Sequence, residues 1–302
     1  MRIKGILFGL TLAIAGQAGA VELWVANYFG NNVKRFDIDT GVEVGSINGI
    51  LGPLGMTYGP GNKVYIAAEN SNSIRTFSPT GTDLGNFATV GMNAPTAIAF
   101  KGGSAFVASF NANSVTQYDL GGNFAGTFIT AGSGAMNGPD IGMTFGPDGN
   151  LYVPSFWNHR IQKYNGTTGA YLGDFVTAGS GGLTQPRQIL WRDGLAYVTS
   201  DNGSKVLRYN GTTGAFVDTF VTAGSGGLSS ASGMLFYGNS LFIASGRNHR
   251  VLRYDAATGA FQGAFITSGL NGPVTLLVVP EPATLAMIAT GMAMIARRIR
   301  RK

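Results

Sequence analysis

Cysteine is absent from the 302 residues, which excludes disulfides, thiolate metal sites and a cysteine nucleophile. Histidine occurs only twice, and neither an H-x-x-H nor an H-E-x-x-H pair of a zinc site exists. The body of the chain also lacks any sustained helical period, which disfavours a solenoid of strands and helices. Glycine is abundant, with 47 residues beside 44% hydrophobic residues. This mix is typical of many short strands joined by tight turns.

The body of the chain has no excess of either charge. The formal net charge is +6, but of 21 Lys and Arg residues two lie at the start and five in the C-terminal tail. Of 15 acidic residues only Glu281 belongs to that tail, so the body holds 14 residues of each sign. Because phosphate binding needs a basic surface, we expect no nucleic-acid partner.

The N-terminus has the pattern of a cleavable secretory signal. Arg2 and Lys4 precede an apolar run that is too short to span a membrane, and Ala18 and Ala20 form an Ala-x-Ala cleavage site. We therefore expect residues 1–20 to be removed, with the mature chain beginning near Val21. The alternative is an N-terminal strand or helix of the core.

Six related blocks recur along the body. Each has a β-branched or aromatic run, a polar turn, and then Val or Ile followed three residues later by Phe or Tyr, which predicts a hairpin. Two further strand-like segments separate most successive blocks, and the repeat length is about 41 to 46 residues. Four strands at this period predict a β-propeller with six blades. The blocks begin at Leu23, Val64, Ala105, Leu151, Ala196 and Leu241.

The phase of the repeats predicts how the ring closes. Only five copies of the first strand lie between the six blocks, and the missing copy is Pro273 to Val279. We expect this segment to pair with the N-terminal strand and complete the first blade, which leaves no open edge in the ring. The all-β domain then covers residues 21–279.

Two blocks contain an Asn-His pair, in "NHRIQKY" from Asn158 and "NHRVLRY" from Asn248. With the apolar strand that precedes each, these segments resemble NHL repeats, a family that forms six-bladed propellers. The resemblance implies the same NHL-like fold for this chain. The other four blocks keep the apolar frame and change the turn.

Residues 280–302 resemble a second family, the PEP-CTERM sorting signal of Gram-negative bacteria. Pro280, Glu281 and Pro282 are followed by an apolar run from Ala283 to Ala296 and a basic end, formed by Arg297, Arg298, Arg300, Arg301 and Lys302. The resemblance implies export, transient anchoring in the inner membrane and a cut by an exosortase-type peptidase. It also implies a cell surface or extracellular matrix rich in exopolysaccharide, as in biofilms. The alternative is an ordinary C-terminal membrane anchor.

Aromatic residues occupy the repeat turns, where glycine or asparagine would serve. Rings beside Asn, Ser and Thr side chains suit a sugar-binding surface, because rings cover apolar sugar faces and amides bind hydroxyls. The alternative is that the rings fill gaps between blades. The predicted binding residues on this loop face are Tyr28, Phe29, Phe110, Phe156, Trp157, His159 and His249.

The function that these features favour is a non-enzymatic surface or matrix propeller that binds exopolysaccharide or another extracellular ligand, without a cofactor. An alternative is a metal-dependent lactonase- or lyase-like enzyme, with Glu69 and Asp201 holding a divalent cation. The competing interpretation is that both carboxylates cap their hairpin turns. A scaffold that binds another protein is the third class.

Overall fold

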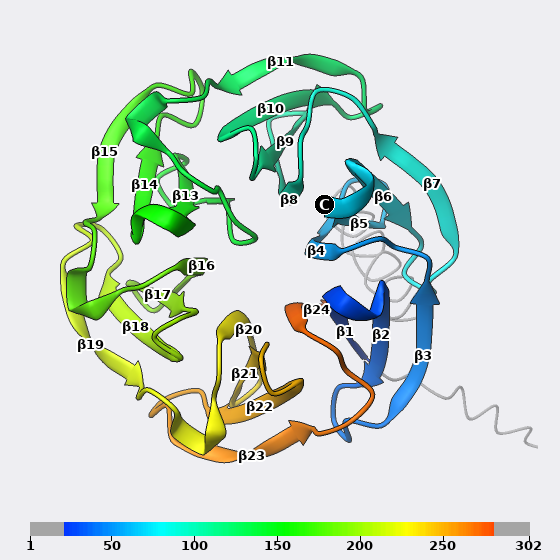
Figure 1. Cartoon of the computed structure of the whole chain (residues 1–302), viewed down its shortest axis with the longest axis vertical. Helices are drawn as coiled ribbons and strands as arrows, with labels where there is room; N and C mark the ends of the chain where they lie inside the picture. Colours follow the sequence, from blue (N-terminus) through cyan, green and yellow to red (C-terminus); the bar gives the residue numbers. More distant parts are fainter. Residues whose placement is uncertain (1–20, 281–302) are drawn as a thin grey trace, which may run out of the picture.

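The computed structural model describes residues 21–280, and its strands form six four-stranded antiparallel sheets. The sheets stand as blades around a common axis, with the first strand of each nearest the axis and the fourth at the rim (Figure 1). The predicted six-bladed β-propeller is confirmed. The predicted signal peptide and all but the first residue of the predicted tail lie outside the described residues. Within residues 21–280, no helix has the length and apolarity needed to cross a bilayer.

The strands of each blade follow the predicted repeat. Blades one to three contain β24 (Pro273–Val279), β1 (Glu22–Asn27), β2 (Asn32–Asp37) and β3 (Glu43–Asn48); β4 (Pro53–Gly59), β5 (Lys63–Ala68), β6 (Ser73–Phe77) and β7 (Asp83–Ala88); and β8 (Pro95–Lys101), β9 (Ser104–Ser109), β10 (Ser114–Asp119) and β11 (Phe124–Ile129). Blades four to six contain β12 (Thr144–Phe145), β13 (Leu151–Ser155), β14 (Arg160–Tyr164) and β15 (Tyr171–Val176); β16 (Pro186–Arg192), β17 (Leu195–Ser200), β18 (Lys205–Asn210) and β19 (Phe216–Val221); and β20 (Ala231–Tyr237), β21 (Ser240–Ser245), β22 (Arg250–Asp255) and β23 (Phe261–Ile266).

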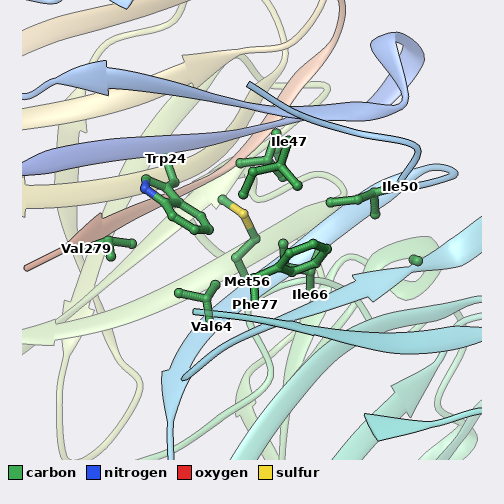
Figure 2. Packing of buried hydrophobic residues seen from close by; sticks show 11 residues of the cluster. Trp24, Ile47, Ile50, Met56, Val64, Ile66, Phe77 and Val279 are labelled. Carbon is green, nitrogen blue, oxygen red and sulfur yellow. The ribbon is translucent and has the colours of Figure 1, made fainter. Parts of the chain in front are cut away.

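The ring closes through β24, as predicted. This strand pairs antiparallel with β1, with Pro273 opposite Asn27 and Val279 opposite Glu22. Val279 is buried in the hydrophobic cluster between blades one and two, where it lies near the fully buried Trp24 (Figure 2). Closure is therefore stabilised both by a backbone ladder and by burial of apolar surface between blades.

Six outer strands face solvent, and irregular pairing protects their edges. In β15, Lys163 pairs with Gly173 and Tyr164 with Tyr171, so Leu172 has no partner in the ladder. Gly173 adopts φ +121°, a conformation that L side chains rarely adopt. Such a bulge bends the edge strand and hinders pairing with a second chain.

A repeated hydrogen bond joins each blade to the next. The turn between the second and third strands ends in a residue with left-handed backbone, φ +47° to +60°. In all six turns the side chain of this residue accepts a hydrogen bond from a backbone N–H that leads into the next blade, at 2.7–3.0 Å. We call these bonds the interblade latches. Their acceptor–donor pairs are Asn31–Gly52, Asn72–Ala94, Asn113–Gly138, His159–Gln185, Ser204–Ser230 and His249–Gly272.

The residue types at the latches suit this geometry. Asn and His are among the few L residues that tolerate left-handed backbone, and a short polar side chain can reach a nearby amide. The six donor residues are also left-handed, with φ +49° to +68°. The two Asn-His pairs of the sequence therefore place their histidines at latch positions.

One blade departs from the common pattern near the axis. The first strand of blade four is reduced to the two residues of β12, whereas the first strands of the other five blades have seven residues each. The segment from Pro139 to Met143 is one residue longer than its counterpart from Pro53 to Met56. The extra residue places the buried Asp140 where it meets a guanidinium of blade five.

Candidate ligand-binding site

A cavity of about 680 Å³ opens at one end of the propeller axis. It lies on the face formed by the turns between second and third strands and the segments that enter the first strands, which we call the loop face. Beneath it Leu54 and Val274 pack against Ile141, which also lines a smaller cavity of about 360 Å³. An apolar plug therefore divides the axis, and the larger cavity has a closed floor.

The five predicted aromatic residues all line this cavity. Phe29 and Trp157 are 66% and 51% exposed, whereas Phe156 is only 7% exposed. The ring of Trp157 packs edge-on against Phe156 at a centroid distance of 4.8 Å and against Phe110 at 6.4 Å. Tyr28 and Phe29 form a second edge-on pair at 5.0 Å. The geometry thus makes Trp157 and Phe29 available to a ligand and gives Phe156 a supporting position.

The two predicted histidines are placed differently. His249 lines the cavity, and its Nδ1 accepts the latch hydrogen bond from Gly272. His159 is not among the cavity-lining residues, and its Nδ1 accepts the equivalent bond from Gln185. Both rings therefore serve the interblade latches, and only His249 can also face a ligand.

The sequence did not predict the charged centre of the cavity, which is Arg187 at the start of β16. Its Nη1 donates to Asp140 at 3.0 Å and its Nε donates to Asp201, so two carboxylates from different blades share one guanidinium. The same guanidinium lies 4.8 Å from the ring centroid of Phe156. The side chain remains 24% exposed, and Nη2 is left as a donor for a ligand.

Burial sets the protonation behaviour of this cluster. It raises the pKa of Asp140 to about 6, against the opposing effect of the Arg187 charge. For Arg187, burial alone would lower the pKa, but Asp140 and Asp201 together hold it above its usual value. The guanidinium is therefore charged at any physiological pH, and Asp140 titrates within the mildly acidic range.

A second polar pair lies across the cavity. The hydroxyl of Tyr28 donates to Glu69, and burial together with this bond raises the pKa of Tyr28 to about 12. The phenol therefore stays protonated and holds the carboxylate in place. Also in the lining, the hydroxyl of Ser232 is buried and has no hydrogen-bond partner among the described residues.

The two carboxylates of the metal hypothesis do line the same cavity. Each already has a partner: Glu69 accepts from Tyr28, and Asp201 accepts from Arg187 and Ser230. Among residues 21–280, no group of three or more His, Asp or Glu side chains is placed to hold a metal ion. A cation at this site would have to compete with the guanidinium of Arg187.

Comparison with known proteins identifies the C-terminal segment. Residues 278–302 match the family model of the PEP-CTERM protein-sorting motif. The chain carries a PEP-CTERM sorting signal. This signal implies export, transient anchoring in the membrane through the C-terminus, and processing by an exosortase-type peptidase.

No curated protein matches the chain. Among solved structures, it is similar to a chain in the crystal structure of a nidogen/laminin complex, with a TM-score of 0.70 and 15% identity over 86% of this chain and 98% of that one. It is also similar to a protein of unknown function from Bacteroides caccae, with a TM-score of 0.70 and 15% identity over 87% and 100%. At this identity the likeness shows the fold alone. The resemblance to NHL repeats stays a prediction.

The raised pKa of Asp140 predicts a pH dependence of stability. Between its ordinary value of 3.8 and about 6, the folded protein binds a proton that the unfolded chain has released. The contribution of Asp140 to the free energy of unfolding therefore falls as the pH rises through this window and is constant above it. Asp140→Asn should remove this dependence.

The measurement is the melting temperature of wild type and Asp140→Asn from pH 4 to pH 7. We expect the wild-type value minus the variant value to fall with rising pH. Asp148→Asn is the matched control, since burial alone would raise the pKa of Asp148 but hydrogen bonds from Lys163 and Asn150 hold it below its usual value. If the difference in melting temperature between wild type and Asp140→Asn stays flat or rises with pH, the pKa of Asp140 is not raised.

Proposed function

We propose that this protein is an exported, non-enzymatic propeller that binds exopolysaccharide through the cavity on its loop face. The observation that carries the proposal is a closed-ended cavity lined both by exposed aromatic rings and by a fixed polar cluster. Trp157 and Phe29 supply the rings, and Arg187 with its two aspartates supplies the polar cluster.

The chemistry of the rings and of the polar cluster suits a sugar ring. The C–H faces of a pyranose pack on aromatic rings, and its hydroxyls need both donors and acceptors. Arg187 offers a free donor, and the buried carboxylates of Asp201 and Asp140 hold its guanidinium in place through the ion pairs. A volume of about 680 Å³ lies within the range of small-ligand sites and would hold a few sugar units.

The closed floor favours one end of a chain, or a side branch, over the middle of a long polymer. Leu54 and Val274 close the cavity against Ile141, so a ligand can enter and leave only through the loop face. The ring of latches fixes the turns around the opening, which limits the rearrangement needed for binding. Once the body is cut from its anchor and lies at the cell surface or in the matrix, this opening can meet the polymer.

A metal-dependent lactonase- or lyase-like reaction is the alternative. It would need a divalent cation at Glu69 and Asp201, and both carboxylates are already engaged with Tyr28, Arg187 and Ser230. This geometry favours binding over catalysis. A shift of the melting temperature on addition of a chelator would support the enzyme instead.

Trp157→Ala tests the sugar-binding proposal. We expect reduced retention on exopolysaccharide of the producing cells, because the exposed ring would cover an apolar sugar face. The melting temperature should change by only about 2–4 °C, since an exposed aromatic pair contributes roughly 1 kcal/mol to stability. The readouts are affinity electrophoresis in the polysaccharide and differential scanning calorimetry.

Phe216→Ala is the matched control, because it removes a ring of similar exposure, 43%, on the rim strand β19. This variant should bind like wild type. If Trp157→Ala binds as well as Phe216→Ala, the cavity is not the sugar site.

The sorting signal makes a prediction about the mature chain. Protein in the extracellular fraction should begin near Val21 and end near Pro280, as measured by intact mass. Replacing Pro280-Glu281-Pro282 by three alanines should leave tail-bearing protein in the cytoplasmic membrane. Peptides from Met294 to Lys302 in the extracellular fraction of wild-type cells would show instead that the protein keeps its tail.

A further inference from the structure

Both ends of the folded chain lie at the end of the propeller that is opposite to the candidate site. The strand β24 begins at Pro273, which lines the loop-face cavity, and runs along the axis to Val279. Its partner β1 begins opposite Val279, at Glu22. In blade two Gly59, the counterpart of Val279, lines the smaller cavity at the opposite end. We call this opposite end the tail face.

The sorting signal follows the propeller without a linker. The PEP-CTERM match begins at Val278, which is still paired with Leu23 in blade one. The apolar run of the signal begins at Ala283, four residues after Val279. At 3.3–3.6 Å per residue, the covalent reach between these two residues is at most about 14 Å. The headgroup layer of one leaflet takes up roughly 5–7 Å of this length.

We propose that the uncut protein stands upright on the membrane, with its tail face against the lipid headgroups and its cavity directed outward. The short connection prevents the propeller from moving far from the bilayer, and its point of attachment beside the axis favours the upright orientation. The strands hold the loop face about 20 Å further out, because six residues rise by about 3.3 Å each.

Two turns of the tail face suit contact with headgroups and not insertion, and the corresponding turns of blades one and three also expose Val42 and Leu120. The two turns connect third to fourth strands and have the polar sequences Asn165–Gly169 and Asn210–Gly214. Thr167, Thr168, Thr212 and Thr213 are exposed in these turns. Hydroxyl and amide groups can exchange hydrogen bonds with headgroups, whereas burying them in hydrocarbon would cost several kcal/mol per unpaired group. The protein can therefore bind its ligand on the loop face before it is released.

The pairing of β24 also limits where the peptidase can cut the chain. A peptidase binds its substrate as a free extended segment, and the ladder of β24 extends to Val279. A cut before this residue would remove buried Val279 from the cluster with Trp24. The cut must therefore fall after Val279, between the rim of the tail face and the bilayer.

The absence of cysteine allows a direct test. Single cysteines are placed at the two ends of β18, as Asn202→Cys on the loop face and Thr212→Cys on the tail face; both residues are exposed. Each full chain, made without the processing peptidase, is labelled with a donor dye. It is then reconstituted in vesicles of phosphatidylethanolamine and phosphatidylglycerol that contain an acceptor-labelled lipid.

We expect the dye at Thr212→Cys to lose more of its emission to the acceptor lipid than the dye at Asn202→Cys. Residues 21–280 alone, labelled at the same positions, are the control and should show equal, minimal loss at both. Equal transfer at both positions in the full chain, stronger transfer from Asn202→Cys, or no transfer at all would overturn the proposal. The readout is independent of sugar binding, so its failure would leave the proposed ligand untouched.

Discussion

Six hydrogen bonds between a turn side chain and a backbone N–H hold the ring together at its loop face. Both residues of each latch have left-handed backbone, so the side-chain acceptor and the amide donor are turned out of their own sheets and toward each other. A single bond of this kind contributes about 0.5–1.5 kcal/mol. Repetition around a closed ring makes the set a geometric constraint, since no blade can tilt without straining two latches.

The candidate site depends on this constraint. The latches fix the turns that carry Trp157 and Phe29, and they fix the segments that lead to Arg187 and Ser232 at the first strands. The ion pairs of Arg187 with Asp140 and Asp201 then join blade four to blade five in the lining of the cavity. A preformed opening results, with apolar rings and polar groups at fixed positions. The sheets beneath supply the core, and the short route from Val279 to the sorting signal places this opening at the far end from the membrane.

Much of the fold could be predicted from the sequence, because strand pattern and repeat length are local signals that recur six times. The closing strand was predicted from the order of the repeats alone, since one copy of the first strand was missing between the blocks and Pro273–Val279 supplied it. The polar centre was missed because Asp140 and Arg187 are 47 positions apart and meet only across two blades. The extra residue between Pro139 and Met143 was the available signal. Likewise the histidines were predicted as loop-face residues, and their role as hydrogen-bond acceptors follows only from backbone geometry that one sequence does not display.

The most direct test of the account is the stability of variants at His249, where the chain itself offers the replacement. Asn is the acceptor at Asn31, Asn72 and Asn113, so His249→Asn should keep the melting temperature within about 2–4 °C of wild type. His249→Ala loses the acceptor and strains the left-handed backbone, which together should cost about 2 kcal/mol. His249→Gly relieves the backbone strain but still lacks the hydrogen bond. Its melting temperature should therefore lie between those of His249→Asn and His249→Ala. If His249→Ala unfolds at the same temperature as His249→Asn, the latches do not hold the ring.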